Sequence, residues 1–367
     1  MKRIIFLAIL VLIFFNPIYG QVILTPDGQK MQVLQDTTQL SSFIDSLYLI
    51  NSFSGIVAIC KNAEIIYEHS KGYANKENQT IINTSTLFNL ASMNKMFTGV
   101  AIAQLVEKNM LSLSDRVIKF FPEYSDKNWA GKATIENLLT HTSGLGEFIP
   151  FQHKIKSLFN LSEIVDTISE TVSKKDPGNE MVYSNAGFYF LGRIIEIITG
   201  ENYFEYIKQN IFIPAGMNNT FFEVNDDQQY ATGYMYDEIA NSIVPNTKVV
   251  KKKGGPAGGA YSNVKDIIAF QKALMDGKLI SKKSLELITV MKVKGKMPGL
   301  GYGLGIGVGV IPNGMKWVGH NGGAPGIATD YSWFIESGYS VIILMNQDAQ
   351  SNLPIMMNVK FMVSNFK

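Results

Sequence analysis

The sequence predicts an α+β fold in which one antiparallel sheet is assembled from both ends of the chain. Two strand-like segments, residues 55–60 and 65–67, stand early and are separated by a Lys-Asn turn. Three more segments, residues 302–311, 327–335 and 339–344, stand late in the chain. Helical spacing dominates the residues between these two groups. This order favours a sheet of about five strands that is flanked by helices and interrupted by a helical region.

Five segments before residue 200 have apolar residues spaced as on one face of a helix. They are residues 37–49, 92–108, 135–139, 161–172 and 186–198. Gly200 and Gly216 are typical of helix ends, and a last helix is expected from residue 353. We expect the helical insertion to span roughly residues 97–255.

Composition places the chain among globular proteins with no nucleic-acid partner. Its 367 residues are 46% hydrophobic and 17% charged, and the formal net charge is only +2. The one basic run, residues 251–253, lies in a Gly-rich stretch and is interpreted as a solvated loop. Cys60 is the single cysteine, so no disulfide forms within the chain, and it is expected to be a small buried hydrophobe.

The N-terminus has the pattern of a secretory signal. Lys2 and Arg3 precede an apolar run, residues 4–15, and the small residue Gly20 follows. The run is short for a membrane span, which takes roughly 20 apolar residues. We therefore expect a signal peptide at residues 1–20, a mature domain at residues 21–367, a periplasmic or secreted protein and no stable membrane span after cleavage. The alternative is an uncleaved membrane anchor.

Ser92 and Lys95 are the first candidate catalytic pair. They stand three residues apart where a helix is expected to begin, so both side chains share one helical face. A serine hydroxyl needs a base to become a nucleophile, and a desolvated lysine can lose its proton and supply that base. The Ser-x-x-Lys spacing alone is weak evidence, because it recurs at Ser262–Lys265 and at Ser364–Lys367.

Tyr183 and Asn185 form the second candidate group. They lie between Pro177-Gly178 and the helix expected from residue 186, so their side chains could project into a cleft. A tyrosine beside a lysine acts as a phenolate base or relays protons. An asparagine both donates and accepts hydrogen bonds, which suits a substrate amide.

His320 is the third candidate, in the segment Gly319-His320-Asn321-Gly322-Gly323. A lone histidine is more often structural than functional. Here, however, Gly322 and Gly323 would let a ligand approach the backbone closely, and the segment stands just before the strand expected from residue 327.

The three groups, in the order Ser-x-x-Lys, Tyr-x-Asn and His-x-Gly, resemble the serine β-lactamase and penicillin-binding protein superfamily. The similar branch contains class C β-lactamases, low-molecular-weight D-Ala-D-Ala carboxypeptidases and β-lactamase-like esterases. The resemblance runs from about residue 53 to about residue 345 and implies the β-lactamase/transpeptidase-like fold. Its other matching segments are residues 138–145, 177–187, 192–196, 214–217 and 257–260.

The resemblance implies a role for each candidate. Ser92 would attack the substrate and become acylated, while Lys95 and Tyr183 would carry its proton to the leaving group. Asn185 would hold the substrate amide, and the backbone N–H groups of Ser92 and Gly323 would form the oxyanion hole. Like the family, the chain would use neither a metal nor another cofactor.

His320 marks the main departure from the family pattern. It stands where many relatives carry the lysine of Lys-Thr-Gly, and Asn321 replaces the hydroxyl residue. A histidine would be only partly charged near neutral pH, so recognition of a substrate carboxylate would be weak. We therefore expect an esterase or D-amino-acid-type peptidase, acting on a small acyl ester, a peptide or a peptidoglycan-like substrate, rather than an efficient β-lactamase.

Three alternatives remain open at this point. A Ser-His-Asp hydrolase could use His141 with Ser143, although the chain has no Gly-x-Ser-x-Gly motif. A metal enzyme is disfavoured because the four histidines show no i, i+4 pairing. A catalytically weak or inactive relative could serve ligand binding or assembly.

Overall fold

The structure is a computed structural model. It describes residues 13–14, 22–23, 34–148, 160–172, 174–178, 180–311, 313–348 and 353–366. The predicted signal peptide, residues 1–20, lies outside these residues apart from the short strand β1.

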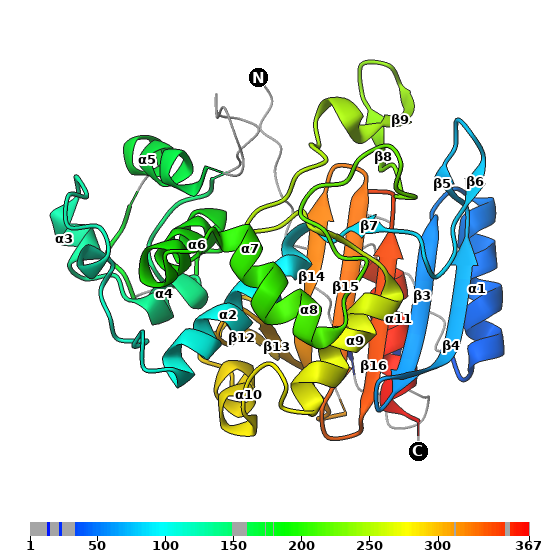
Figure 1. Cartoon of the computed structure of the whole chain (residues 1–367). Helices are drawn as coiled ribbons and strands as arrows, with labels where there is room; N and C mark the ends of the chain where they lie inside the picture. Colours follow the sequence, from blue (N-terminus) through cyan, green and yellow to red (C-terminus); the bar gives the residue numbers. More distant parts are fainter. Residues whose placement is uncertain are drawn as a thin grey trace.

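Within the described residues, one large sheet of eight strands runs in the order β11-β12-β13-β14-β15-β16-β3-β4 (Figure 1). All neighbouring strands in it are antiparallel. Its strands are β3 (Gly55–Lys61), β4 (Glu64–Lys71), β11 (Val293–Lys294), β12 (Leu300–Tyr302), β13 (Gly307–Val310), β14 (Lys316–Ala324), β15 (Ile327–Phe334) and β16 (Tyr339–Met345). Because β16 pairs with β3, the two ends of the chain build one sheet, as predicted.

Four two-stranded pairs lie outside this sheet. They are β1 (Ile13–Phe14) with β2 (Val22–Ile23), β5 (Tyr73–Asn75) with β6 (Thr80–Ile81), β7 (Phe88–Asn89) with β10 (Tyr261–Ser262), and β8 (Tyr234–Asp237) with β9 (Ser242–Pro245). The pair of β7 with β10 leads directly into the segment that carries Ser92.

The sheet has eight strands rather than about five, because one predicted strand is split, the segment of His320 adds a strand, and β11 was not predicted. The segment predicted as one strand, residues 302–311, is split into β12 and β13 by a turn in which the Gly303 N–H donates to the Ile306 carbonyl at 2.8 Å. The segment that holds His320 was not predicted as a strand, yet it forms the second half of β14. That half has no apolar alternation, because its residues border the candidate site rather than the core.

The helices predicted before residue 200 and from residue 353 are present, although the one predicted at residues 92–108 begins as a 3-10 turn. The helices at residues 127–130, 203–207, 213–215, 264–275 and 282–289 had no predicted range. The described α-helices are α1 (Thr37–Leu49), α2 (Lys95–Glu107), α3 (Lys127–Ala130), α4 (Ile135–Leu139), α5 (Leu161–Thr171), α6 (Asn185–Thr199), α7 (Tyr203–Ile207), α8 (Ile213–Ala215), α9 (Val264–Met275), α10 (Lys282–Thr289) and α11 (Leu353–Ser364). The 3-10 turns are η1 (Ala91–Asn94), η2 (Val117–Lys119) and η5 (Asn246–Lys248), and η4 (Lys208–Phe212) is a π-helical turn. Gly200 and Gly216 end α6 and α8 in the left-handed conformation, as predicted. None of the described helices is long and apolar enough to cross a membrane.

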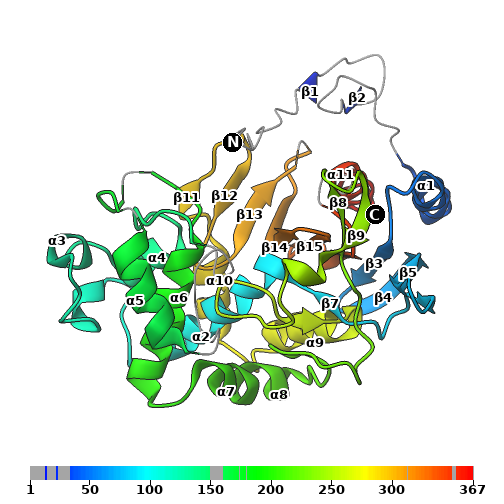
Figure 2. The same ribbon diagram turned by 90° about the horizontal axis from the view of Figure 1, so that it is seen from above.

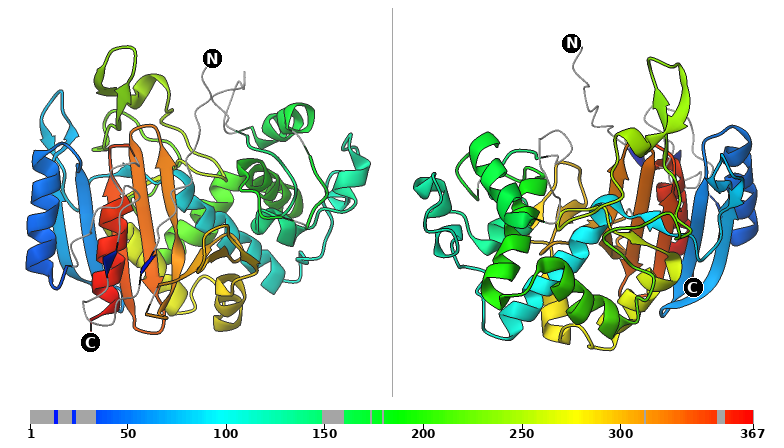
Figure 3. Two further views of the ribbon diagram at one scale, coloured as in Figure 1. Left: turned by 180° about the vertical axis from the view of Figure 1, so that it is seen from behind. Right: turned by 45° about the horizontal axis from the view of Figure 1, so that its top comes forward.

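Both faces of the central strands β15, β16 and β3 are buried, and each face has its own hydrophobic core. Val57 and Ile59 of β3 point to a cluster that includes α1 and α11, whereas Ile56, Ala58 and Cys60 point to a larger cluster with α2, α6 and α9. Figures 2 and 3 show α1 and α11 on one side of the sheet and the remaining large helices on the other. Cys60 is fully buried, as the sequence predicted.

Candidate active site

Ser92 lies in η1, a tight turn between β7 and α2 that is fixed at both ends. Ala91 has a positive φ of 45°, and its N–H donates to the Asn89 side-chain carbonyl at 2.9 Å. On the other side, the buried Asn94 side chain accepts from the Ala260 N–H at 2.8 Å. The turn therefore holds the serine in one place at the start of α2, whose first residue is Lys95.

The Lys95 side chain is fully buried and meets three neutral acceptors. Its Nζ lies 3.1 Å from Ser92 Oγ, 2.7 Å from Asn185 Oδ1 and 2.5 Å from the Ala257 carbonyl. Desolvation lowers the pKa of Lys95 to about 7, against the opposing charge of Glu147. Near neutral pH much of this lysine is therefore an uncharged amine, whose lone pair can accept the serine proton.

The lysine of the competing Ser-x-x-Lys match at Ser262 is exposed to solvent. Lys265 lies on the outside of α9, while Ser262 Oγ is 2.8 Å from Thr220 Oγ1. Burial therefore separates the pair Ser92–Lys95 from this decoy, although the sequence spacing is the same.

Tyr183 stands immediately before α6 with its ring facing the lysine. Lys95 Nζ is 4.8 Å from the centre of the Tyr183 ring. The residue keeps 37% of its surface exposed, but burial around the phenol raises its pKa above the usual range, and a hydrogen bond with the Ser92 side chain only partly opposes this. The phenol is therefore protonated at neutral pH, which favours a proton relay over a phenolate base.

Glu147 is a site residue that the sequence reasoning did not single out. Its Oε1 accepts from Asn185 Nδ2 at 2.6 Å, so the other side of the amide, Oδ1, faces Lys95. Burial raises the pKa of the Glu147 carboxyl. The only sequence signal for Glu147 was its place two residues after the family-like segment that ends at residue 145, and that signal is weak.

The second half of β14 forms the opposite side of the site. Its partner β13 pairs only as far as Gly319, whereas β15 pairs from Val318 to the end of the strand at Ala324. One edge of β14 beyond Gly319 is therefore open towards the Ser92 turn. A Cβ on Gly322 would lie 2.3 Å from the Leu90 carbonyl, so only glycine lets the strand approach this closely. Gly323 follows on the same strand and is exposed.

His320 lies on β14 but does not present a charge to the site. The residue is 4% exposed, its Nε2 lies 2.5 Å from the Tyr302 hydroxyl, and its Nδ1 lies 2.5 Å from the Asn321 carbonyl. Desolvation, assisted by the charge of Lys95, lowers the pKa of His320 to about 3. The expectation of a partial charge near neutral pH was therefore wrong, because it neglected burial.

The contacts of His141 do not support the Ser-His-Asp alternative. Its Nδ1 accepts from the Ser184 backbone N–H at 3.1 Å, whereas the Ser143 hydroxyl lies 3.4 Å from the Leu145 N–H. The imidazole instead packs against Tyr183, with ring centres 4.2 Å apart.

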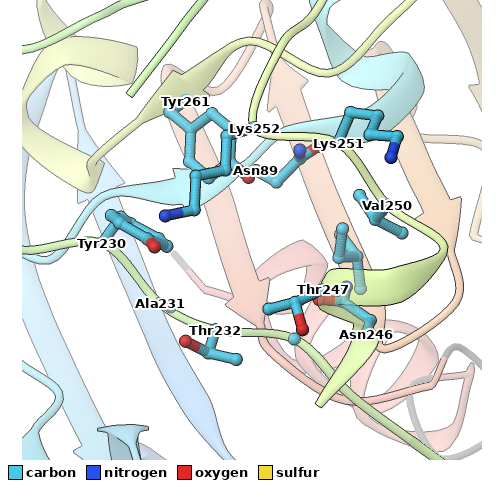
Figure 4. A pocket seen from close by; sticks show the side chains of 12 residues that line it. Asn89, Tyr230, Ala231, Thr232, Asn246, Thr247, Val250, Lys251, Lys252 and Tyr261 are labelled. Carbon is cyan, nitrogen blue, oxygen red and sulfur yellow. The ribbon is translucent and has the colours of Figure 1, made fainter. Parts of the chain in front are cut away.

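A cavity of about 130 Å³ lies beside the Ser92 turn (Figure 4). Its lining residues come from β7, β10, β15, the segment before β8, and η5 with the residues after it. They are Asn89, Tyr230, Ala231, Thr232, Gly233, Asn246, Thr247, Val250, Lys251, Lys252, Tyr261 and Ile327. No predicted site residue lines it, but Asn89 does, and this side chain also caps the turn that carries Ser92. Of the basic run, Lys252 pairs with Asp226 and Lys251 is exposed.

The fold and the site together define a serine hydrolase of the β-lactamase/transpeptidase-like class. The family model described as Beta-lactamase matches residues 50–355, and the chain therefore belongs to the Beta-lactamase family.

Its relatives include penicillin-binding proteins. Penicillin-binding protein 4* of Bacillus subtilis strain 168 is 31% identical over 329 residues, covering 84% of this chain and 71% of that protein. The crystal structure of a penicillin binding protein from Bacillus halodurans has a TM-score of 0.75 at 26% identity, over 86% of this chain and 98% of that one. D-amino acid amidase from Ochrobactrum anthropi SV3, complexed with D-phenylalanine, matches in fold with a TM-score of 0.78 at 23% identity, over 90% and 99% of the two chains.

Proposed function

We propose that this protein is an exported hydrolase that cleaves an ester or amide bond through an acyl-enzyme on Ser92. The observation that carries the proposal is the contact between Ser92 Oγ and a fully buried Lys95, 3.1 Å away, whose pKa is lowered to about 7. The same lysine touches Asn185, so the nucleophile, its base and a substrate-binding amide are held in one network.

In the proposed acylation step, the proton of Ser92 reaches the leaving group through Lys95 and Tyr183. The Ser92 Oγ–H proton passes to the neutral amine of Lys95 as Oγ attacks the acyl carbon. The backbone N–H groups of Ser92 and Gly323 stabilise the negative oxygen that develops. Tyr183 then gives its phenolic proton to the leaving group and regains one from the lysine, so the acyl-enzyme forms with both groups in their starting states.

The neutral state of His320 supports the preference for esters and short peptide amides. A fixed cation at this position would attract a substrate carboxylate, but a buried neutral imidazole offers no such attraction. We therefore propose an esterase or D-amino-acid-type peptidase with weak β-lactamase activity. Location in the periplasm or outside the cell is proposed from the signal-like pattern of residues 1–20 alone.

The proposal is tested by labelling with a fluorophosphonate, which phosphonylates an activated serine. We expect the fluorophosphonate to label the wild-type protein on Ser92, as located by peptide mass spectrometry, and we expect no label on Ser92→Ala. Ser262→Ala is a matched control, because it removes the serine of the decoy pair and should retain the label. An unlabelled wild-type protein, or equal labelling of Ser92→Ala, would favour the alternative of an inactive binding protein.

A parallel assay separates the substrate classes. We expect turnover of p-nitrophenyl esters to exceed turnover of nitrocefin by a wide margin, because nitrocefin carries a carboxylate and these esters do not. D-alanyl-D-alanine peptides, which also end in a carboxylate, measure how far peptides are accepted. Nitrocefin turnover as fast as that of the best ester would contradict the role given to the neutral His320.

A further inference from the structure

His141 occupies an unusual position directly behind Tyr183. It follows α4, is 1% exposed and adopts a left-handed backbone conformation with a φ of 60°, which is unfavourable for a residue with a side chain. Its ring lies 4.2 Å from that of Tyr183 and 4.6 Å from that of Tyr302, measured between centres. The left-handed backbone ends α4, because the Thr142 N–H donates to the Asn137 carbonyl at 2.9 Å, but this helix end does not require a buried polar ring.

Two hydrogen bonds tie His141 to the backbone on both sides of Tyr183. The His141 carbonyl accepts from the Val182 N–H at 2.8 Å, and His141 Nδ1 accepts from the Ser184 N–H at 3.1 Å. The residue between these two anchors is Tyr183, whose ring lies against the imidazole. The position of the phenol is therefore constrained by three contacts with one residue.

The second hydrogen bond requires an unprotonated Nδ1. Burial, assisted by the nearby Lys95 when it is charged, lowers the pKa of His141 well below its usual value, so the ring is neutral with its proton on Nε2. Among the described residues, Nε2 has no hydrogen-bond partner. A buried donor without a partner costs stability, and the contacts of the ring that compensate for it are those that hold the segment of Tyr183.

We propose that His141 is a positioning residue that fixes the Tyr183 phenol over Ser92 and Lys95 through the Ser184 N–H and the ring contact. The inference rests on the proposed function for its kinetic part, because it assigns His141 an effect on proton transfer by Tyr183. His141 itself takes no part in the proton path.

Two substitutions separate the hydrogen bond from the ring contact. His141→Asn places a side-chain oxygen near the position of Nδ1 and suits the left-handed backbone, but it removes the ring. His141→Phe keeps an aromatic ring against Tyr183 and leaves the Ser184 N–H without its acceptor. With the best ester as substrate, we expect kcat to fall about 100-fold in His141→Phe and less than tenfold in His141→Asn.

A double-mutant cycle distinguishes positioning from general damage to the fold. If His141 acts through Tyr183, His141→Phe should lower kcat by less than about threefold in a Tyr183→Phe background, where the phenol is already gone. Equal losses in the wild-type and Tyr183→Phe backgrounds would overturn the proposal. If His141→Phe does not fold, the cycle is run with His141→Asn instead. An effect of His141→Asn on kcat that is the same with and without the Tyr183 phenol would also overturn the proposal.

Amide hydrogen exchange tests the positioning without any turnover. In Ser92→Ala protein, we expect His141→Phe to speed exchange of the Ser184 amide at least tenfold, while the Val182 amide, which bonds to the backbone, changes little. Unchanged protection of Ser184 would contradict the positioning role even if the enzyme proves active. A wild-type protein that takes no fluorophosphonate label would refute the proposed function. The exchange of the Ser184 amide would then still test whether His141 positions the segment of Tyr183.

Discussion

The two lysines Lys95 and Lys360 are both buried, but their surroundings give them opposite tasks. Lys360 on α11 forms an ion pair with Asp330 of β15 at 2.9 Å and is 6% exposed. Lys95 is fully buried and contacts only neutral acceptors among the described side chains and backbone, with Glu147 reached through Asn185.

The comparison indicates that the group in contact with a buried lysine, and not burial alone, determines whether the lysine is charged. A carboxylate in direct contact favours the charged ammonium, which stabilises a structural pair. Neutral acceptors leave desolvation uncompensated, which lowers the pKa of Lys95 to about 7 and makes the amine available as a base. In the proposed function, the two lysines, on opposite faces of one sheet, thus serve structure in one place and chemistry in the other.

The largest expected effect separates the two lysines by activity. Lys95→Met removes the base and should lower the rate of fluorophosphonate labelling by about 10²–10⁴-fold, the usual contribution of a general base. Lys360→Met, the matched control, should label at close to the wild-type rate. Near-normal labelling of Lys95→Met would show that another group activates Ser92.

The next effect separates them by stability. Lys360→Met leaves the Asp330 carboxylate buried without its partner, and the free energy of unfolding should fall by about 3–5 kcal/mol. Adding Asp330→Asn should recover part of this loss, because no charge then remains buried, and urea unfolding measures both variants. A single variant as stable as the wild type would remove the contrast between the two lysines.

The sequence predicted those features that depend on short-range spacing. The side chains of Ser92 and Lys95 meet because residues three apart share a helical face, and the pairing of β3 with β16 follows from two apolar runs at the chain ends. The order of the three motifs was enough to predict the family. The positions of Tyr183 and Asn185 at the start of α6 also agree with the predicted loop-to-helix boundary.

Features that depend on burial by residues distant in the sequence could not be predicted from local spacing. The neutral state of His320 arises because Tyr302 and the surrounding strands remove water from its ring. The contact of Glu147 with Asn185 joins residues 38 positions apart. The second half of β14 lacks apolar alternation because its residues border the site. In each case the missing information was which side chains surround the residue.

The measurement that tests the central claim most directly is the pH dependence of the rate at which Ser92 reacts with a fluorophosphonate. Only the neutral amine of Lys95 accepts the serine proton, so a pKa lowered to about 7 predicts a rate that is low in acid, half-maximal near pH 7 and constant at higher pH. Rapid-mixing experiments with the fluorophosphonate over pH 5–10 give this profile. A midpoint near that of an ordinary lysine, or a rate independent of pH, would contradict activation of Ser92 by a neutral Lys95.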